Sequence, residues 1–316
     1  MRITILSSLL ALSLTSAQSA CNNNAGTGHD ALTDKDTCVM TGHDSIPRPI
    51  MRTDIHYTSE DSAWICRQLK ESETITEHAA LPLFFARKFI GRPYVAHTLE
   101  VLDNEKLIVN TTQLDCTTLV ENVAAMTICA RKRLCTFNDF AEVLRSLRYR
   151  NGQLDGYTSR LHYFSDWIDN KEEMGLTTCI QTEQPPFTAI QKLNTDYMST
   201  HSQSYKALAA HPEYVHEIRQ TEKALTGKTY RYIPKGSVTN TQLMRKTVKD
   251  GDIIAITCNK KGLDIAHLGF AVWRNDGLHL LNASMIHKKV VEEPLTLYKY
   301  LQRHPSHTGI RIIRIN

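Results

Sequence analysis

The hydrophobic pattern changes its period once along this chain of 316 residues, and this change constrains the fold more than any other feature. Before about residue 225, apolar side chains recur at helical spacing, as Ala80, Leu83 and Phe89 do. After Gly251 they alternate with polar residues in short runs separated by turn residues, as strands do. Helices first and antiparallel strands last is an α+β order. We therefore predict an α+β domain over residues 55–316.

The same patterns place the individual elements. Helices are expected over 59–72, 77–90, 115–128, 138–149, 159–170, 204–210 and 212–225. Strands are expected over 252–257, 265–273, 278–282 and 311–315, with a hairpin formed by 98–102 and 107–110. The segment 185–227 is polar and His-rich and suggests no second core, so we predict that it is an insertion.

The first residues read as an export signal. Arg2 precedes an apolar run, 3–14, that is too short to span a bilayer, and small residues follow it. We predict a signal peptide over 1–20 and a flexible linker over 21–54. Cys21 ends a lipobox-like sequence in which Gln18 is atypical, so cleavage by an ordinary signal peptidase and lipidation at Cys21 both stay open. The protein is expected to be exported, either periplasmic or anchored by lipid, without a transmembrane helix.

Charge and cysteine content narrow the chemistry. The net charge of +4 is too small to favour a nucleic-acid partner. Eight cysteines include Cys21, and the remaining odd number is compatible with one free reactive thiol. The sequence contains no His-Glu-x-x-His and no paired Cys-x-x-Cys pattern, so we predict neither a metal site nor a cofactor.

Cys116 stands out among the cysteines because Asp115, which precedes it, is a good helix cap. At the first turn of a helix, unpaired N–H groups and the helix dipole favour a thiolate, so we expect a lowered thiol pKa. Position alone leaves a second interpretation open, in which Cys116 is a small core residue or half of a disulfide.

His267 lies in the middle of an apolar strand, where its ring nitrogens need partners. Asn282 follows 282 − 267 = 15 residues later, a spacing that suits neighbouring antiparallel strands. Its side chain could then accept a hydrogen bond from the ring and fix the tautomer, as the third member of a catalytic triad does. Gly269 would allow the neighbouring backbone to approach closely.

Together these residues resemble the NlpC/P60 family of cell-wall cysteine peptidases and amidases. The resemblance is carried by the turn 91–94 (Gly-Arg-Pro-Tyr), by Asp115-Cys116, by Gly251-Asp252 with the strand that holds His267, and by Asn282. The segments 114–121, 156–163 and 262–270 are most similar to the N-acetylmuramoyl-L-alanine amidase-like branch, formerly the family of unknown function DUF1460. Many relatives have His at the third position, and Asn can orient a ring but cannot relay a proton.

The resemblance implies a papain-like α+β fold and a function. Cys116 would attack the lactyl carbonyl of muramic acid, and His267 would pass the proton to the amine of L-alanine. Tyr94 would help to stabilise the oxyanion. The implied partners are muropeptides, chiefly anhydromuropeptides. The residues implied to bind them are Asp115, Tyr157, Ser159, Arg160 and His162.

Other readings remain. The stretch 157–163 could be an ordinary helix start, with Ser159 or its neighbour as the cap. The same Cys–His pair also occurs in γ-D-glutamyl endopeptidases, which cut within the stem peptide. A third possibility is an inactive wall-binding scaffold.

Overall fold

The computed structural model describes residues 51–316. The predicted signal peptide, most of the predicted linker and Cys21 lie outside the described residues. A short 3-10 turn, η1 (Arg52–Asp54), occupies the end of the predicted linker.

The first half of the domain is a layer of helices. Its members are α1 (Ser59–Ser72), η2 (His78–Ala80), α2 (Leu81–Arg87), α3 (Cys116–Arg131), α4 (Phe137–Arg148), η3 (Arg150–Gly152), η4 (Tyr157–Ser159) and α5 (Phe164–Glu173). Three of these helices begin with a capping box, in which side chains at the N-cap and at the third helical position bind each other's backbone N–H; the caps are Thr58, Asp115 and Thr136. These local signals explain why α1, α3 and α4 begin within a residue of their predicted positions.

The second half forms an antiparallel sheet. Its strands are β3 (Thr177–Ile180), β4 (Ala189–Lys192), β5 (Thr229–Pro234), β6 (Ile253–Cys258), β7 (Ile265–Arg274), β8 (Gly277–Ser284), β9 (Lys289–Glu292) and β10 (His307–Ile315). Their order is β4-β5-β10-β6-β7-β8-β9, and β3 also pairs with β10. The last strand of the chain therefore lies in the middle of the sheet, while β7 and β8 are adjacent, as the sequence predicted.

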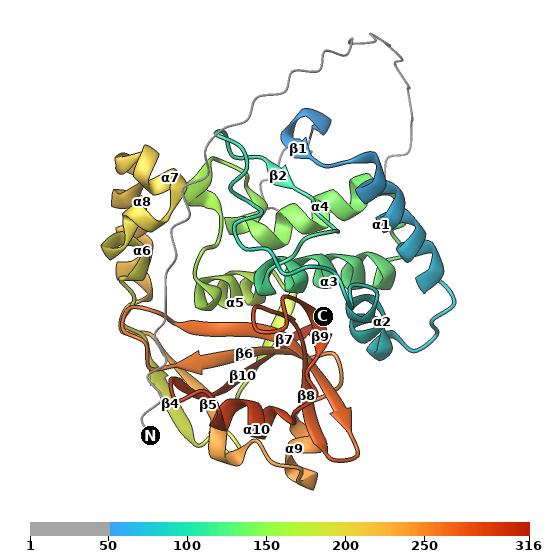
Figure 1. Cartoon of the computed structure of the whole chain (residues 1–316), viewed down its shortest axis with the longest axis vertical. Coiled ribbons are helices and arrows are strands. Elements are labelled where there is room, and N and C mark those ends of the chain that lie inside the picture. Colours follow the sequence, from blue (N-terminus) through green and yellow to red (C-terminus); the bar gives the residue numbers. More distant parts are fainter. Residues whose placement is uncertain (1–50) are drawn as a thin grey trace. The chain divides into compact units, whose positions relative to one another are not determined.

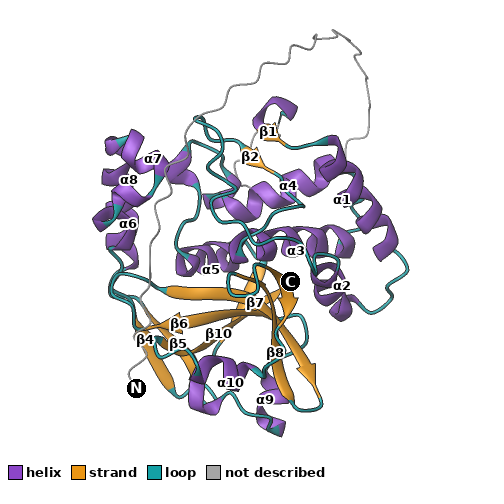
Figure 2. Ribbon diagram, viewed as in Figure 1, coloured by secondary structure: helices purple, strands orange, loops and turns teal. Residues whose placement is uncertain are grey.

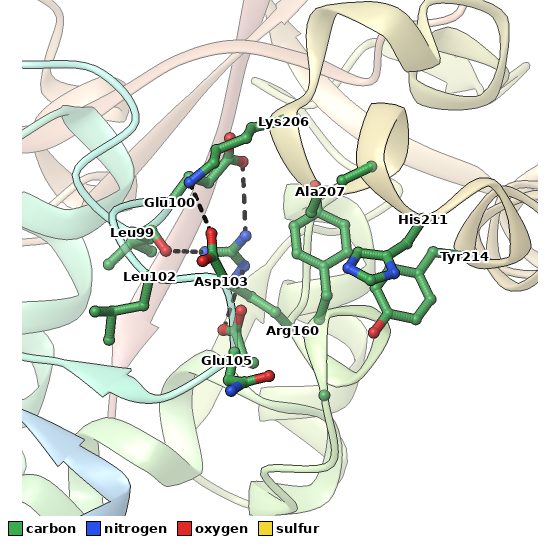
Figure 3. A pocket seen from close by; sticks show the side chains of 14 residues that line it. Leu99, Glu100, Leu102, Asp103, Glu105, Arg160, Lys206, Ala207, His211 and Tyr214 are labelled. Carbon is green, nitrogen blue, oxygen red and sulfur yellow. Dashed lines mark hydrogen bonds and ion pairs between the residues drawn. The ribbon is translucent and has the colours of Figure 1, made fainter.

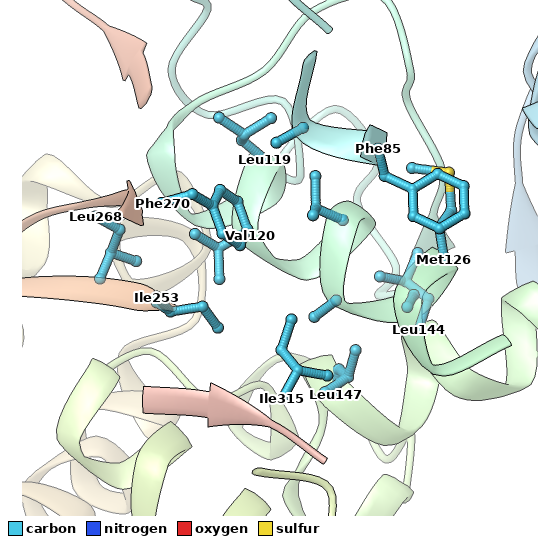
Figure 4. Close-up of a cluster of buried hydrophobic side chains, with 14 of the residues drawn as sticks. Phe85, Leu119, Val120, Met126, Leu144, Leu147, Ile253, Leu268, Phe270 and Ile315 are labelled. Carbon is cyan, nitrogen blue, oxygen red and sulfur yellow. The ribbon is translucent and has the colours of Figure 1, made fainter. Parts of the chain in front are cut away.

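Helices cover both faces of the sheet (Figures 1 and 2). The main core lies between the sheet and the first helices. There α3 contributes Leu119 and Val120 against Ile253, Leu268 and Phe270 (Figure 4). A second buried cluster lies on the opposite face, beneath η6 (Lys235–Ser237), α9 (Gln242–Thr247) and α10 (Leu297–Gln302). Together these observations confirm the predicted α+β class.

In the segment 185–227 both predicted helices form. Besides β4 it forms α6 (Tyr197–Thr200), η5 (Ser202–Ser204), α7 (Lys206–Ala210) and α8 (Pro212–Leu225). It also has a hydrophobic cluster, which includes Leu193, Met198, Leu208, Ile218 and Leu225. The cluster also includes Tyr157, Tyr163 and Tyr230 from outside the segment. The apolar residues are spaced far apart among polar ones, and they meet only when α6, α7 and α8 pack together.

The predicted hairpin over 98–110 is also wrong. Only β2 (Leu107–Ile108) forms there, and it pairs in parallel with β1 (Ile55–His56). Residues 98–106 form turns and bends, because the buried side chain of Arg160 binds this segment and replaces strand pairing.

Two further observations concern the described part of the chain. Its six cysteines are all free thiols. No helix in residues 51–316 has the length and apolar character to cross a membrane.

Candidate active site

Cys116 is the first residue of α3, and its position is fixed by the helix cap. The Asp115 carboxylate accepts a hydrogen bond from the Thr118 backbone N–H at 2.8 Å, and the Thr118 hydroxyl accepts from the Asp115 N–H at 2.9 Å. This confirms the predicted cap and holds the half-buried thiol at the start of the helix.

The protonation state of Cys116 differs from the prediction. Burial raises the pKa of its thiol to about 12, and the negative charge of Asp115 adds to the effect. Hydrogen bonds from the Leu268 N–H and the Thr117 hydroxyl lower the pKa of the thiol, but by less than burial raises it. Because burial outweighs the effect of the helix start and Asp115 adds a negative charge, the expected lowered pKa is not produced. In the free protein, Cys116 is therefore a neutral thiol near pH 7.

His267 lies on β7, with Asn282 beside it on β8. Nε2 of His267 is 2.9 Å from Oδ1 of Asn282, which confirms the contact expected from their spacing. An amide oxygen only accepts, so Nε2 carries the proton and Nδ1 is free to accept one. Burial lowers the pKa of His267, which keeps the ring neutral near pH 7 and so able to accept a proton.

Gly269 lets the two strands approach closely enough for this bond. A Cβ atom at Gly269 would lie 2.6 Å from the carbonyl oxygen of Leu281 and 2.8 Å from Cδ1 and Cγ of Leu280. Both distances are shorter than van der Waals contact, so β8 could not keep its place beside a larger residue.

Cys116 and His267 line the same small cavity, of about 160 Å³. The other residues that line it are Thr117, His162, Tyr163, Phe164, Tyr197, Met198, Tyr205 and residues 263–266 and 268. Three of these, Tyr197, Met198 and Tyr205, come from the segment 185–227. Periodicity did not mark them, because a polar segment with scattered aromatic residues gives no sign of which side chains face a site.

Tyr94 lies near Cys116 but does not line this cavity. Its backbone bridges to Leu114, two residues before the thiol, and its N–H donates to the Lys288 carbonyl at 3.0 Å. Burial raises the pKa of Tyr94 to about 12, with Cys116 and Asp115 as the neighbouring groups that add to the shift. Its hydroxyl is therefore protonated near pH 7 and available as a donor.

The stretch 157–163 divides between two places. His162 lines the cavity with Cys116, and its Nε2 lies 3.0 Å from the Tyr157 carbonyl oxygen. Burial and the charge of Arg160 lower the pKa of His162 to about 3, so this ring is neutral. The Ser159 hydroxyl donates to the Gly156 carbonyl at 2.7 Å and stabilises the η4 turn.

Tyr157 and Arg160 line a second cavity, of about 410 Å³, between the loop 99–105 and the helices α7 and α8 (Figure 3). Arg160 donates to the Leu99 carbonyl at 3.3 Å, and its guanidinium lies 3.6 Å from Glu100 and 3.7 Å from Glu105. These bonds show that Arg160 anchors the loop. The structure thus places Arg160 and Tyr157 away from the cavity that contains Cys116, although the Tyr157 and His162 rings pack at 4.4 Å.

Sequence reasoning missed one further polar group. Glu293, just after β9, is 3% exposed and accepts a hydrogen bond from the Asn282 amide at 3.1 Å. A Glu-Glu-Pro sequence gives no indication that its second carboxylate turns inward. Within residues 51–316 no cluster of His, Cys, Asp and Glu has the arrangement of a metal site.

Comparison with known proteins shows the family. A family model described as N-acetylmuramoyl-L-alanine amidase-like matches residues 84–310. A solved structure of an N-acetylmuramoyl-L-alanine amidase from Bacteroides uniformis is 40% identical, has a TM-score of 0.71 and covers 76% of this chain and 99% of its own.

Two other solved structures are similar. A Bacteroides fragilis protein provisionally described as a xylanase is 44% identical, with a TM-score of 0.68 and coverage of 73% of this chain and 99% of its own. A Legionella pneumophila protein assigned to DUF1460 is 23% identical, has a TM-score of 0.64, covers 81% and 94% of the two chains and shares the fold. No curated protein matches the chain. The chain belongs to the N-acetylmuramoyl-L-alanine amidase-like family.

Proposed function

We propose that this protein is a cysteine amidase that hydrolyses the bond between the lactyl carbonyl of N-acetylmuramic acid and L-alanine in peptidoglycan fragments. The observation that carries the proposal is the arrangement at one cavity: Cys116 and His267 line it together, and Asn282 binds the far nitrogen of the His267 ring. The packing of α3 against β7 supports a papain-like arrangement and membership of the NlpC/P60 superfamily.

The proposed reaction follows from the protonation states. His267 Nδ1 accepts the thiol proton while Sγ of Cys116 attacks the lactyl carbonyl, which avoids a free thiolate in a buried site. The oxyanion forms near the Cys116 N–H and the Tyr94 hydroxyl. His267 then protonates the leaving amine of L-alanine, and a thioester remains on Cys116. Water, deprotonated by His267, attacks this thioester and releases the lactyl carboxylate and the thiol.

The size of the cavity supports fragments as substrates. At about 160 Å³ it is smaller than typical ligand sites and encloses only the reacting segment. Tyr197 and Tyr205 from the segment 185–227 form part of its wall, and a wall polymer would require an open groove at this point. We therefore propose muropeptides, chiefly those with an anhydromuramoyl end, and assign His162 and Asp115 to the surroundings of the bound amide.

Glycoside hydrolysis, which the Bacteroides fragilis description suggests, has less support. Glycosidases generally use two carboxylic acids on either side of the sugar bond. Among the described residues, Asp264 is the sole acidic side chain that lines the Cys116 cavity, and it accepts a hydrogen bond from the Ser165 N–H at 2.7 Å.

The test is product identification by mass spectrometry after incubation with a disaccharide-anhydromuramoyl tetrapeptide. We expect free tetrapeptide and bare disaccharide from the wild type and no cleavage by Cys116→Ala. Cys135→Ala is a matched control, because Cys135 is an exposed free thiol outside the cavity. Cleavage within the peptide would reassign the protein as an endopeptidase, and no cleavage of fragments or intact wall would favour a scaffold.

We further propose export through residues 1–20, after which Cys21 either is lipidated or stays free. Membrane fractionation of wild type and Cys21→Ala separates these cases. Loss of membrane association in the variant identifies the lipid anchor, and equal release of both proteins argues against it.

A further inference from the structure

A chain of polar side chains continues behind the His267–Asn282 pair. The Asn282 Nδ2 donates to Glu293 Oε1 at 3.1 Å, and Nε2 of His287 lies 3.1 Å from Glu293 Oε2. Asn282 is fully buried and Glu293 is 3% exposed, whereas His287 is about one third exposed. These hydrogen-bonded side chains thus lead from the cavity through two buried groups to the surface.

The carboxylate decides how the Asn282 amide is turned. A carboxylate only accepts hydrogen bonds, so the NH₂ group of Asn282 must face Glu293 and its oxygen must face His267. An amide oxygen in turn requires a proton on Nε2 of His267, which leaves Nδ1 as the proton acceptor. Without Glu293, the amide could rotate by half a turn and bind the opposite tautomer.

The main chain keeps Glu293 in place. Its N–H donates to the Leu280 carbonyl at 2.8 Å, and its carbonyl accepts from Nδ1 of His279 at 2.9 Å. His279 is itself bound to Asp276 at 3.0 Å. The backbone N–H and carbonyl group of Glu293 are therefore both hydrogen-bonded to β8, the strand that holds Asn282.

We propose that Glu293 is a positioning residue, which fixes the Asn282 amide and through it the tautomer of His267 that accepts the proton from Cys116. The proposal rests on the proposed cysteine mechanism. A buried carboxylate at this place also favours the imidazolium that forms when His267 takes the proton.

Other charges around His267 must be counted in any test that depends on pH. Glu293 and Asp115 raise the pKa of His267, whereas burial, the largest effect, and the nearby His304 lower it. His307 has its own pKa lowered to about 4, first by burial and then by electrostatic interaction with His304, His267, Lys260 and Lys235, so it is neutral in the working range. Around Glu293 the titratable neighbours are His287 and Tyr300.

The experiment compares Glu293→Gln with Glu292→Gln. Glutamine keeps the shape of Glu293 but can present either its oxygen or its NH₂ to Asn282. Glu292 is a matched control, because it precedes Glu293 and forms ion pairs with Arg87 and Arg274 instead. Nitrogen-15 histidine NMR, with His267→Ala for assignment, reads the tautomer and pKa of His267 directly and requires no substrate.

We expect Glu293→Gln to reduce the Nε2–H tautomer and to lower the pKa of His267, which moves the acid limb of kcat/KM to lower pH. With muropeptide, kcat should fall about 10- to 100-fold while KM changes little. His287→Gln leaves the Asn282–Glu293 bond intact and should therefore leave the tautomer of His267 unchanged.

Glu293→Gln with the same tautomer, pH profile and kcat as Glu292→Gln would overturn the proposal. If Glu293→Gln fails to fold, the wild-type spectra decide: a His267 ring that carries its proton on Nδ1 would overturn the proposal, and one that carries it on Nε2 would support it. If the wild type cleaves no muropeptide, the proposed function fails, but the NMR experiment still tests whether Glu293 sets the tautomer of His267.

Discussion

Gly269 should be a position where one methyl group damages both the fold and the site. A Cβ atom there would lie 2.6 Å from the Leu281 carbonyl oxygen. Relief to about 3.4 Å, an ordinary contact, requires β7 and β8 to separate by about 3.4 − 2.6 = 0.8 Å. The same displacement would lengthen the His267–Asn282 distance from 2.9 Å to about 3.7 Å, beyond a hydrogen bond.

Gly269→Ala is therefore expected to cost about 1–3 kcal/mol in unfolding free energy, as overpacking does, or about 2–12 °C in Tm for a domain of this size. Activity should fall further than this loss explains, with kcat reduced up to about 100-fold and KM nearly unchanged. Thermal unfolding and steady-state kinetics on one preparation measure both effects.

Gly236→Ala is the matched control, because nothing lies within 4 Å of a Cβ atom at this exposed glycine. Its Tm and kcat should stay at the wild-type values. If Gly269→Ala behaves like Gly236→Ala, the strand spacing does not hold His267 and Asn282 together, and the reasoning is refuted.

Three further predictions concern charges. Glu121 and Arg148 form a buried ion pair at 2.7 Å, so Glu121→Ala should lower the unfolding free energy in urea by about 3–5 kcal/mol, and a loss below about 1 kcal/mol would contradict this. Because burial and Asp115 raise the pKa of Cys116 to about 12, the rate at which iodoacetamide alkylates it should keep rising from pH 6 to 10. The rate should be higher in Asp115→Asn. A rate that reaches a plateau above pH 7 would instead show a thiolate. Burial lowers the pKa of Lys171 to about 7, so between about pH 7 and 10 the unfolded chain holds more protons than the folded one, and stability should rise with pH. Denaturant midpoints measured across this window should show a smaller rise in Lys171→Met. An unchanged rise would exclude Lys171 as its source.

Local signals made the starts of α1, α3 and α4 and the His267–Asn282 contact predictable. Asp115 caps α3 through contacts within four residues, and the short apolar runs of β7 and β8 depend on neighbouring positions. The His267–Asn282 contact followed from a strand spacing of 15 residues, which is also local.

The remaining features depend on long-range packing. The loop 98–106 is held by Arg160, more than fifty residues away, so its hairpin-like sequence was misleading. Tyr197 and Tyr205 reach the cavity only after α6, α7 and α8 have packed. The raised pKa of Cys116 depends on how deeply the thiol is buried, which the position of a helix start does not reveal.

The most direct test of the proposed amidase reaction is the mass of the acyl-enzyme. Wild-type protein is quenched in acid during turnover of a disaccharide-anhydromuramoyl tetrapeptide, and its intact mass and the modified residue are read. We predict a gain equal to the disaccharide acyl group alone, located on Cys116. A gain that includes alanine and glutamate, or one that persists in Cys116→Ala, would contradict cleavage of the muramoyl–alanine bond by this cysteine.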